Sequence, residues 1–266
     1  MDVAAYLERL AYQGPRTPEL AVLRALQRAH LRHVPFENLD IALGRPLVLD
    51  EAALFAKVVR RRRGGFCYEL NGLFAALLRA LGFDVTALSA RVLSDGQLGP
   101  EFDHMALLVQ SPGAASERYL VDVGFGASFE EPLRLDVSEP QPQPVGVYRV
   151  SQSAGLWWMH ELDADGQAVD GYAFSLTPRQ LADYAPMCVW QQTAPESTFT
   201  RKRVCTRATP DGRLTYSGTG AANRLSLTRP SGREEITLTS PAQCAALLDE
   251  HFGLRLDADL APWFMA

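Results

Sequence analysis

One strongly amphipathic segment, preceded by two adjacent glycines, most constrains how this chain can fold. Over residues 70–81, apolar side chains keep the i, i+3, i+4, i+7 spacing that builds one buried stripe on a helix. The stripe consists of Leu70, Leu73, Phe74, Leu77, Leu78 and Leu81. Gly82 follows as a stop, while Gly64 and Gly65 lie just before the first turn, which contains Cys67. The pattern predicts a buried helix that begins with a thiol.

The position of Cys67 favours a reactive thiolate. The first turn of a helix has unpaired N–H groups and the positive end of the helix dipole, and both stabilise a negatively charged sulfur. Arg61, Arg62 and Arg63 precede the cysteine and add positive charge nearby in the sequence. The alternative is an inert cysteine, because free cysteines are commonly buried. A nucleophilic role therefore needs a base and an orienting group elsewhere in the chain.

A histidine and an acid follow in segments that predict a β-hairpin. We interpret residues 104–109 as a strand, 111–116 as a turn and 118–123 as the returning strand. A turn centred at residue 113 places His104 directly opposite Asp122, and a centre at residue 114 makes them diagonal neighbours on one face. A centre between those two positions puts the side chains on opposite faces. The pairing thus depends on the register of the hairpin.

Each of these two residues also has a simpler interpretation. His104 fits a polar residue at a strand entry, and Asp122 fits an ordinary acid at a strand end. An acid between Val121 and Val123, however, needs a hydrogen-bonded partner to offset its desolvation, and His104 can supply one. The remaining histidines are expected to have structural or surface roles; they are His30, His33, His160 and His251.

Several short motifs lie in order along nearly the whole chain. They are Val34–Leu39, Arg63–Cys67, Asn71–Phe74, His104, Val121–Gly126, Pro195–Phe199 and His251–Leu254. In this combination the chain resembles the arylamine N-acetyltransferases. The resemblance implies a catalytic triad, with Cys67, His104 and Asp122 as its three members by position. It further implies acetyl-CoA as co-substrate, no permanently bound cofactor, and an arylamine or hydrazine as the acceptor.

The same resemblance implies a substrate-binding segment next to the acid of the triad. The residues assigned to substrate binding are Phe125, Gly124, Gly126 and Phe36. Taken alone, a Gly-x-Gly sequence is more often a turn, so the resemblance carries this assignment. Phe125 is expected to offer a flat apolar wall to the substrate.

The chemistry of such a triad predicts a two-step reaction. His104 takes the proton of Cys67, and Asp122 orients the ring and stabilises its positive form. The thiolate attacks the acyl thioester, so an acetyl-cysteine forms and CoA leaves before the amine binds, a ping-pong scheme. The backbone N–H of Cys67 is the first candidate donor to the oxyanion, and a second donor is left open. An ion pair between Glu37 and Arg63 is expected to fix the nucleophile loop.

The periodicity changes along the chain in a way that indicates an α+β fold. Helical patterns dominate to about Gly82, with a start at Thr17 and Pro18, and short alternating segments follow as strands. The expected strands are 85–92, 104–109, 119–123, 145–150, 213–217, 224–228 and 235–239. A late helix opens at Ser240 with a capping-box spacing. The proline-rich stretch 139–144 is expected to be an extended connector.

The resemblance implies three lobes around a cysteine-protease-like Cys-His-Asp core. They are an N-terminal helical bundle with the nucleophile (1–83), a central β-barrel with His104 and Asp122 (84–194), and a C-terminal α/β lid (195–266). The triad is then assembled across the interface of the first two lobes.

Composition excludes several other classes of protein. With 266 residues, a net charge of −5 and a pI near 5.6, the chain has no general basic surface, so nucleic acid is not an expected partner. The four cysteines are far apart, which argues against a zinc site. No run approaches the roughly 18 apolar residues of a membrane span, and a free catalytic thiol suits a reducing cytoplasm. A homodimer is left open.

Three other functions remain compatible with a Cys-His-Asp triad. One is a thiol hydrolase, such as a protease or a transglutaminase-like enzyme, since only the acyl donor differs. A second is an amide synthase that releases or cyclises a biosynthetic acyl chain. A third is a binding protein that retains the fold without catalysis.

Overall fold

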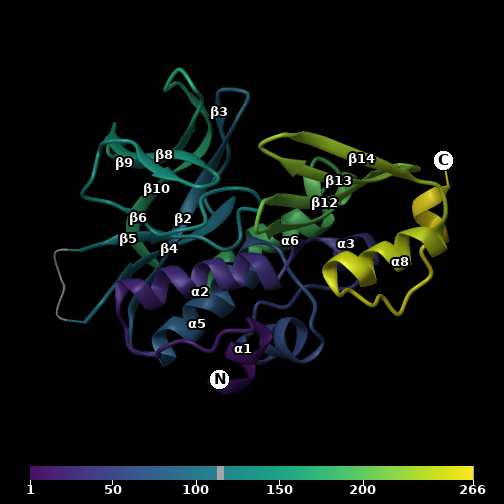
Figure 1. The fold of residues 1–266 in the computed structure, drawn as a ribbon, viewed down its shortest axis with the longest axis horizontal. Helices are drawn as coiled ribbons and strands as arrows, with labels where there is room; N and C mark the ends of the chain where they lie inside the picture. Colours follow the sequence, from purple (N-terminus) through teal and green to yellow (C-terminus); the bar gives the residue numbers. More distant parts are fainter. Residues whose placement is uncertain (113–116, 266) are drawn as a thin grey trace.

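The computed structural model describes residues 1–112 and 117–265, and Figure 1 shows three groups of elements in it. Helices from the first part of the chain lie along the bottom of the view, a curled sheet stands above them on the left, and a second sheet with a long helix lies on the right. This arrangement confirms the predicted α+β class. The predicted lobe boundaries, after residues 83 and 194, stay a prediction.

The first part of the chain is helical, as its periodicity predicts. Its helices are α1 (Val3–Arg9), α2 (Leu20–His33), α3 (Leu39–Ala42), α4 (Glu51–Phe55), the π-helix η1 (Ala56–Arg60) and α5 (Cys67–Ala80). Asp2 caps α1 by accepting a hydrogen bond from the N–H of Ala5. The predicted start of α2 was wrong by two residues, because the N–H of Glu19 bonds to the carbonyl of Thr17 in a turn before the helix.

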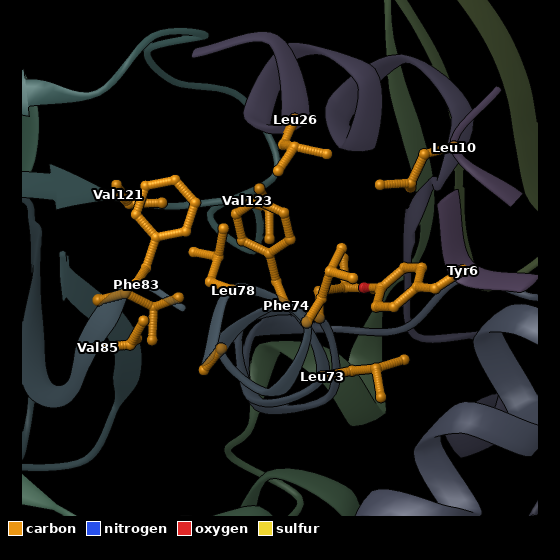
Figure 2. Close-up of a cluster of buried hydrophobic side chains, with 14 of the residues drawn as sticks. Tyr6, Leu10, Leu26, Leu73, Phe74, Leu78, Phe83, Val85, Val121 and Val123 are labelled. Carbon is orange, nitrogen blue, oxygen red and sulfur yellow. The ribbon is translucent and has the colours of Figure 1, made fainter. Parts of the chain in front are cut away.

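Helix α5 lies at the centre of the largest apolar core. Its stripe packs against the N-terminal helices on one side and against the sheet on the other (Figure 2). Leu73 and Phe74 lie near Tyr6, while Leu78 lies near Phe83 and Val121. All six side chains are at most 4% exposed. Full burial of one such side chain stabilises the fold by about 1.5–3 kcal/mol, so this core fixes the start of α5 firmly.

The curled sheet has nine strands and is nearly closed. Its strands are β2 (Asp84–Ser94), β3 (Gln97–Leu98), β4 (His104–Gln110), β5 (Tyr119–Val121), β6 (Leu133–Arg134), β7 (Gln141–Gln143), β8 (Gly146–Ser153), β9 (Leu156–Leu162) and β10 (Ala168–Arg179). Their order is β6-β5-β4-β2-β10-β9-β8-β7, with β3 paired to β2. The side chain of Gln141 on β7 bonds to the backbone N–H and carbonyl of Arg134 on β6, and this contact joins the two edges.

The sheet corrects one prediction. The proline-rich stretch 139–144 is not only a connector, because Gln141–Gln143 form the edge strand β7. The strand pairs with β8, placing Pro142 opposite Val147. Proline is tolerated there because an edge strand does not need all of its N–H donors.

The second sheet brings together distant parts of the chain. It contains β1 (Phe36–Glu37), β11 (Arg203–Thr209), β12 (Gly212–Thr219), β13 (Ala222–Arg229) and β14 (Gly232–Leu238), in that order. Three elements lie between β10 and β11 in the chain, η2 (Leu181–Tyr184), α6 (Ala185–Thr193) and α7 (Thr198–Arg201), and two follow β14, α8 (Pro241–Phe252) and η3 (Ala261–Phe264). Strand β1 pairs with β11, and its Phe36 also forms a bridge with Gly65 in the loop before α5. This loop is therefore anchored, through β1, to the C-terminal part of the chain.

Two local features of this C-terminal part agree with the sequence. Ser240 caps α8 through its hydroxyl oxygen, which accepts from the N–H of Gln243, as the capping pattern predicts. Gly253 ends the helix with a left-handed φ of 66°, a conformation that glycine adopts without strain. Among the described residues, none of the helices has the length and apolar character needed to cross a membrane.

Candidate active site

The register of the hairpin places His104 and Asp122 on one face of the sheet. Strands β4 and β5 pair Leu108 with Leu120, which corresponds to a centre at residue 114. His104 and Asp122 are therefore diagonal neighbours, one of the arrangements that the sequence left open. Part of the predicted turn, residues 113–116, lies outside the described residues. The ring nitrogen Nε2 of His104 is 2.7 Å from Oδ2 of Asp122, and both side chains are buried.

Asp122 is held by a set of neutral donors. Besides His104, its oxygens accept hydrogen bonds from Nδ2 of Asn71 at 2.8 Å, the N–H of Gly124 at 2.8 Å and the hydroxyl of Tyr172 at 3.1 Å. Asn71 also bonds to the N–H of Val123 and the carbonyl of Met105. This network fixes the carboxylate, and through it the ring of His104, in one orientation.

Cys67 is the first residue of α5, where the sequence predicted it. The loop before it packs tightly: a side chain at Gly64 would place a Cβ only 2.0 Å from the carbonyl oxygen of Pro35. Gly65 pairs with Phe36 in a parallel bridge. Gly64 is therefore required for close backbone contact with Pro35, the residue before β1, whereas a Cβ at Gly65 would lie 2.7 Å from the carboxylate of Glu69.

The electrostatic surroundings of the thiol differ from the prediction. Burial raises the pKa of Cys67 well above its usual value, and the carboxylates of Asp103 and Asp122 act in the same direction, against a hydrogen bond from the backbone of Met105. The arginines that precede the loop are not among the main groups that act on this pKa. Arg63 is instead paired with buried acids, and Arg61 lines a different cavity. A thiolate at Cys67 therefore needs a positively charged imidazole beside it.

Cys67 and His104 border the same cavity, which has a volume of about 690 Å³. The other residues that line it come from β1, β2 and β3, from the loops around His104 and Asp122, and from the segment 190–199. They are Phe36, Val92–Ser94, Gln97–Gly99, Asp103, Gly124, Phe125, Ala127, Trp190, Gln191, Glu196, Thr198 and Phe199. Asp122 lies behind His104. Three phenylalanine rings line the wall, which suits a flat aromatic ligand.

The predicted substrate-binding residues divide into two groups. Phe36, Gly124 and Phe125 line the cavity, whereas Gly126 does not. Gly126 has a φ of 91°, and its carbonyl accepts a hydrogen bond from Arg213, so its role is to turn the chain. The ring of Phe125 lies 5.2 Å from that of His104, measured between centroids, so it packs on the histidine as well as facing the cavity.

Comparison with known proteins identifies the family. A family model described as N-acetyltransferase matches residues 19–261. The arylamine N-acetyltransferase of Mycolicibacterium smegmatis is 38% identical over 268 residues, which cover 98% of this chain and 94% of the relative. The chain belongs to the arylamine N-acetyltransferase family. This is an acyltransferase family, and the predicted enzyme class is therefore confirmed.

Solved structures of family members share the fold of this chain. The arylamine N-acetyltransferase of M. tuberculosis has a TM-score of 0.85 and 36% identity, covering 95% of this chain and 93% of that one. The Mycobacterium marinum enzyme, solved in complex with CoA, also has a TM-score of 0.85, with 33% identity and coverage of 95% and 92%. The helices, the nearly closed sheet and the C-terminal sheet are thus the architecture of the family.

The sequence did not predict two residues, Asn71 and Tyr172, whose side chains donate hydrogen bonds to Asp122. Asn71 was named only as the start of the motif Asn71–Phe74, and Tyr172 was not considered. Asn71 lies one helical turn after Cys67, so its position on the same side of the helix was the available signal. Tyr172 comes from β10, a strand that was not predicted, and the sequence offered no signal for it.

The predicted pair of Glu37 and Arg63 is present and belongs to a larger group of buried charges. We call it the ion cluster; its members are Glu37, Asp40, Lys57, Arg63 and Glu69. Arg63 contacts Glu37 at 2.7 Å and Asp40 at 2.9 Å. Lys57 contacts Asp40 at 2.9 Å and Glu69 at 2.8 Å.

The ion cluster reaches the nucleophile loop through Glu69. The second oxygen of this carboxylate accepts from the N–H of Phe66, the residue before Cys67. Glu69 thereby satisfies one of the open N–H groups at the start of α5. Within the described residues there is no group of three or more histidines, cysteines and acids that could hold a metal ion.

Proposed function

We propose that this protein transfers acetyl from acetyl-CoA to arylamines or arylhydrazines by a ping-pong mechanism through acetylated Cys67. One observation carries the proposal: Cys67 and His104 border one cavity, and His104 is bonded through Nε2 to the buried carboxylate of Asp122. With Nε2 committed to Asp122, Nδ1 is the nitrogen that exchanges protons with the sulfur and the substrates. Acetyl-CoA is the co-substrate of this family.

In the first step, the proton of Cys67 moves to Nδ1 of His104, which creates a thiolate and an imidazolium. The imidazolium supplies the positive charge that the buried thiol otherwise lacks, and Asp122 stabilises it. The sulfur attacks the thioester carbonyl, and the backbone N–H of Cys67 donates to the developing oxyanion. The bond between carbonyl carbon and CoA sulfur then breaks, and the CoA thiolate leaves with the proton from His104.

In the second step, the amine attacks the acetyl carbonyl of acetyl-Cys67. His104, now neutral, accepts a proton from the amine nitrogen as the amide bond forms. The bond from carbon to Cys67 sulfur breaks, and the proton returns to regenerate the starting pair. The rings of Phe36, Phe125 and Phe199 give the aromatic part of the acceptor a surface on which to stack.

The test is to incubate the protein with acetyl-CoA in the absence of any amine. The wild type should gain one acetyl group, located on Cys67 by peptide mass spectrometry, and should release one equivalent of CoA. Cys67→Ala should gain none and lose all turnover. Cys244→Ala is the matched control, because this buried cysteine belongs to the C-terminal core; it should acetylate normally.

The outcome also separates the alternative functions. Continuous release of CoA without an acetylated amine would indicate a thiol hydrolase. Acetylation only from longer acyl donors, with small arylamines refused, would indicate an amide synthase. A wild-type protein that stays unmodified would contradict the proposal.

The proposal includes a cytoplasmic location. All four cysteines are free and buried, which suits a reducing compartment.

A further inference from the structure

The cavity beside Cys67 has an unbalanced charge. Among the described residues that line it, Asp103 and Glu196 are acids, and none is lysine or arginine. His104, the remaining ionisable base of the wall, is already bonded to Asp122. A cavity of this kind attracts positive groups and repels negative ones.

Asp103 is the more deeply placed of the two acids. It directly precedes His104 at the start of β4 and is partly buried, whereas Glu196 is exposed at the rim. Its Oδ1 accepts a hydrogen bond from Nε2 of Gln191 at 3.0 Å. The amide of Gln191 is neutral and fixes the direction of the carboxylate without cancelling its charge.

The surroundings of Asp103 offer little to compensate this charge. Burial raises the pKa of Asp103, while His104, the backbone of Val92 and the side chain of Gln191 act in the opposite direction. Among the described residues, no lysine or arginine lies within ion-pair distance of this carboxylate, and the base that acts on its pKa is His104. A partly buried acid without a cationic side chain can take its positive partner from a ligand.

Asp103 also lies within electrostatic reach of the reaction. Its carboxylate is one of the charges that act on Cys67. An amine that attacks acetyl-Cys67 must enter the same cavity, so a charged substituent on that amine is held close to Asp103. The effective dielectric constant in a cleft is well below that of water, and one charge then has a large effect on binding.

We propose that Asp103 is a specificity-determining residue, which makes the cavity select acceptor amines that carry a second, positively charged group and disfavour anionic arylamines. The inference rests on the proposed function and adds the charge class of the acceptor to it. Glu196 contributes in the same direction from the rim, with a smaller effect because it is exposed to solvent.

The experiment uses three acceptors of nearly equal size and shape. They are 4-aminobenzamidine, which is cationic, 4-aminobenzamide, which is neutral, and 4-aminobenzoate, which is anionic. The value of kcat/KM for each acceptor is measured at pH 8 for the wild type and for Asp103→Asn. In a ping-pong reaction this constant reports the second step alone, and each variant is compared with the wild type for the same amine, so differences in amine reactivity cancel.

We expect Asp103→Asn to lower kcat/KM for the cation relative to the neutral acceptor by about tenfold, and to raise it for the anion by a similar factor. Asp103→Glu, which restores the charge, should keep the wild-type order. Glu196→Gln should change the same ratios by less than about threefold. Because the neutral acceptor is the reference, a general effect of Asp103 on His104 or Cys67 leaves these ratios unchanged.

An equal change for all three acceptors in Asp103→Asn would overturn the inference. So would a wild type that uses 4-aminobenzoate as well as 4-aminobenzamidine once each kcat/KM is divided by the rate at which the same amine attacks a small acetyl thioester in solution, a result that needs no variant and holds even if Asp103→Asn does not fold. Neither result affects the proposed function, because acetyl-Cys67 still forms and still transfers. Absence of acetyl-Cys67 would instead contradict the proposed function itself.

Discussion

Two buried polar groups meet at the start of α5, and they are built in opposite ways. On the cavity side, Asp122 is a single carboxylate surrounded by neutral donors and one histidine. On the other side, the ion cluster sets three carboxylates against two cations, and each cation contacts two acids within 3.0 Å. The second group holds its two cations in place, whereas the mechanism proposed for the first group needs one proton to move.

The pKa values of Lys57 and Arg63 show how firmly the ion cluster keeps its cations charged. Burial acts to lower the pKa of Lys57, but Glu69, Glu37 and Asp40 outweigh burial and raise it. Burial likewise acts to lower the pKa of Arg63, and its acids again raise it. Both cations therefore stay charged, and a fixed set of charges can hold a loop in place. Catalysis requires the opposite, a group such as His104 that gains and loses a proton in each cycle.

The largest effect on activity is expected from Asp122→Asn. The amide preserves shape but presents a donor or a neutral acceptor to His104, so the ring loses both its orientation and the stabilisation of its positive form. We expect the rate of CoA release in a single turnover to fall by about 10⁴-fold, the size of the effect of the same substitution in a Ser-His-Asp triad. Tyr172→Phe removes a single hydrogen bond to the same carboxylate and serves as the control, with an expected loss below about tenfold. Equal losses in the two variants would mean that the network acts by packing alone.

For Arg63→Met, in the ion cluster, we expect the reverse of the result for Asp122→Asn: a large loss of stability and a small loss of activity. Removal of this guanidinium leaves Glu37, which is fully buried, without its cation. Breaking a buried pair in this way costs about 3–5 kcal/mol of unfolding free energy, measured by urea denaturation. The folded fraction should keep its kcat within about tenfold. Arg61→Met is the control from the same basic run; its exposed side chain should cost less than about 0.5 kcal/mol. A full loss of activity with unchanged stability would assign Arg63 to the catalytic group instead.

The sequence predicted the positions of Cys67, His104 and Asp122 well because local rules determine them. The apolar stripe of α5 and the glycines at its start place Cys67, and the hairpin pattern brings His104 and Asp122 together once the register is known. The register itself depended on a turn whose centre the sequence left ambiguous by one residue. A centre between residues 113 and 114 would turn Asp122 to the other face, away from His104, and the observed pairing excludes it. The choice between the two centres that keep both side chains on one face is not visible in the apolar pattern, because Tyr119, Leu120 and Val121 are all buried.

Features that depend on long-range contacts could not be predicted. Strand β1 is two residues long and gains its partner, β11, from a segment about 170 residues later, so periodicity carries no signal for it. The expected effect of the arginines on Cys67 was wrong for a related reason. Charges that are close in sequence were assumed to be close in space, yet Arg63 points into the ion cluster and leaves the thiol to burial.

The smallest expected effect, and the sharpest test of a fixed ion cluster, is the pH dependence of Asp40→Asn. Burial acts to raise the pKa of Asp40, but Lys57 and Arg63 outweigh it and hold this pKa below its usual value. An acid whose pKa is lowered by folding stabilises the protein above its unfolded pKa, which is about 4, and this contribution disappears as the pH falls through the folded pKa. The variant should therefore be less stable than the wild type by about 2 kcal/mol at pH 7.

The difference in unfolding free energy between the two proteins should stay constant from pH 7 to about pH 5 and shrink below about pH 4, as measured by urea denaturation at each pH. Asp84→Asn, at an exposed position on β2, should show less than about 0.5 kcal/mol at pH 7. A difference that persists unchanged to low pH would mean that Asp40 acts through shape and hydrogen bonding. The charges of the ion cluster would then contribute little to stability. The remaining difference between the ion cluster and the group around Asp122 would be that only the second is connected, through His104, to the cavity beside Cys67.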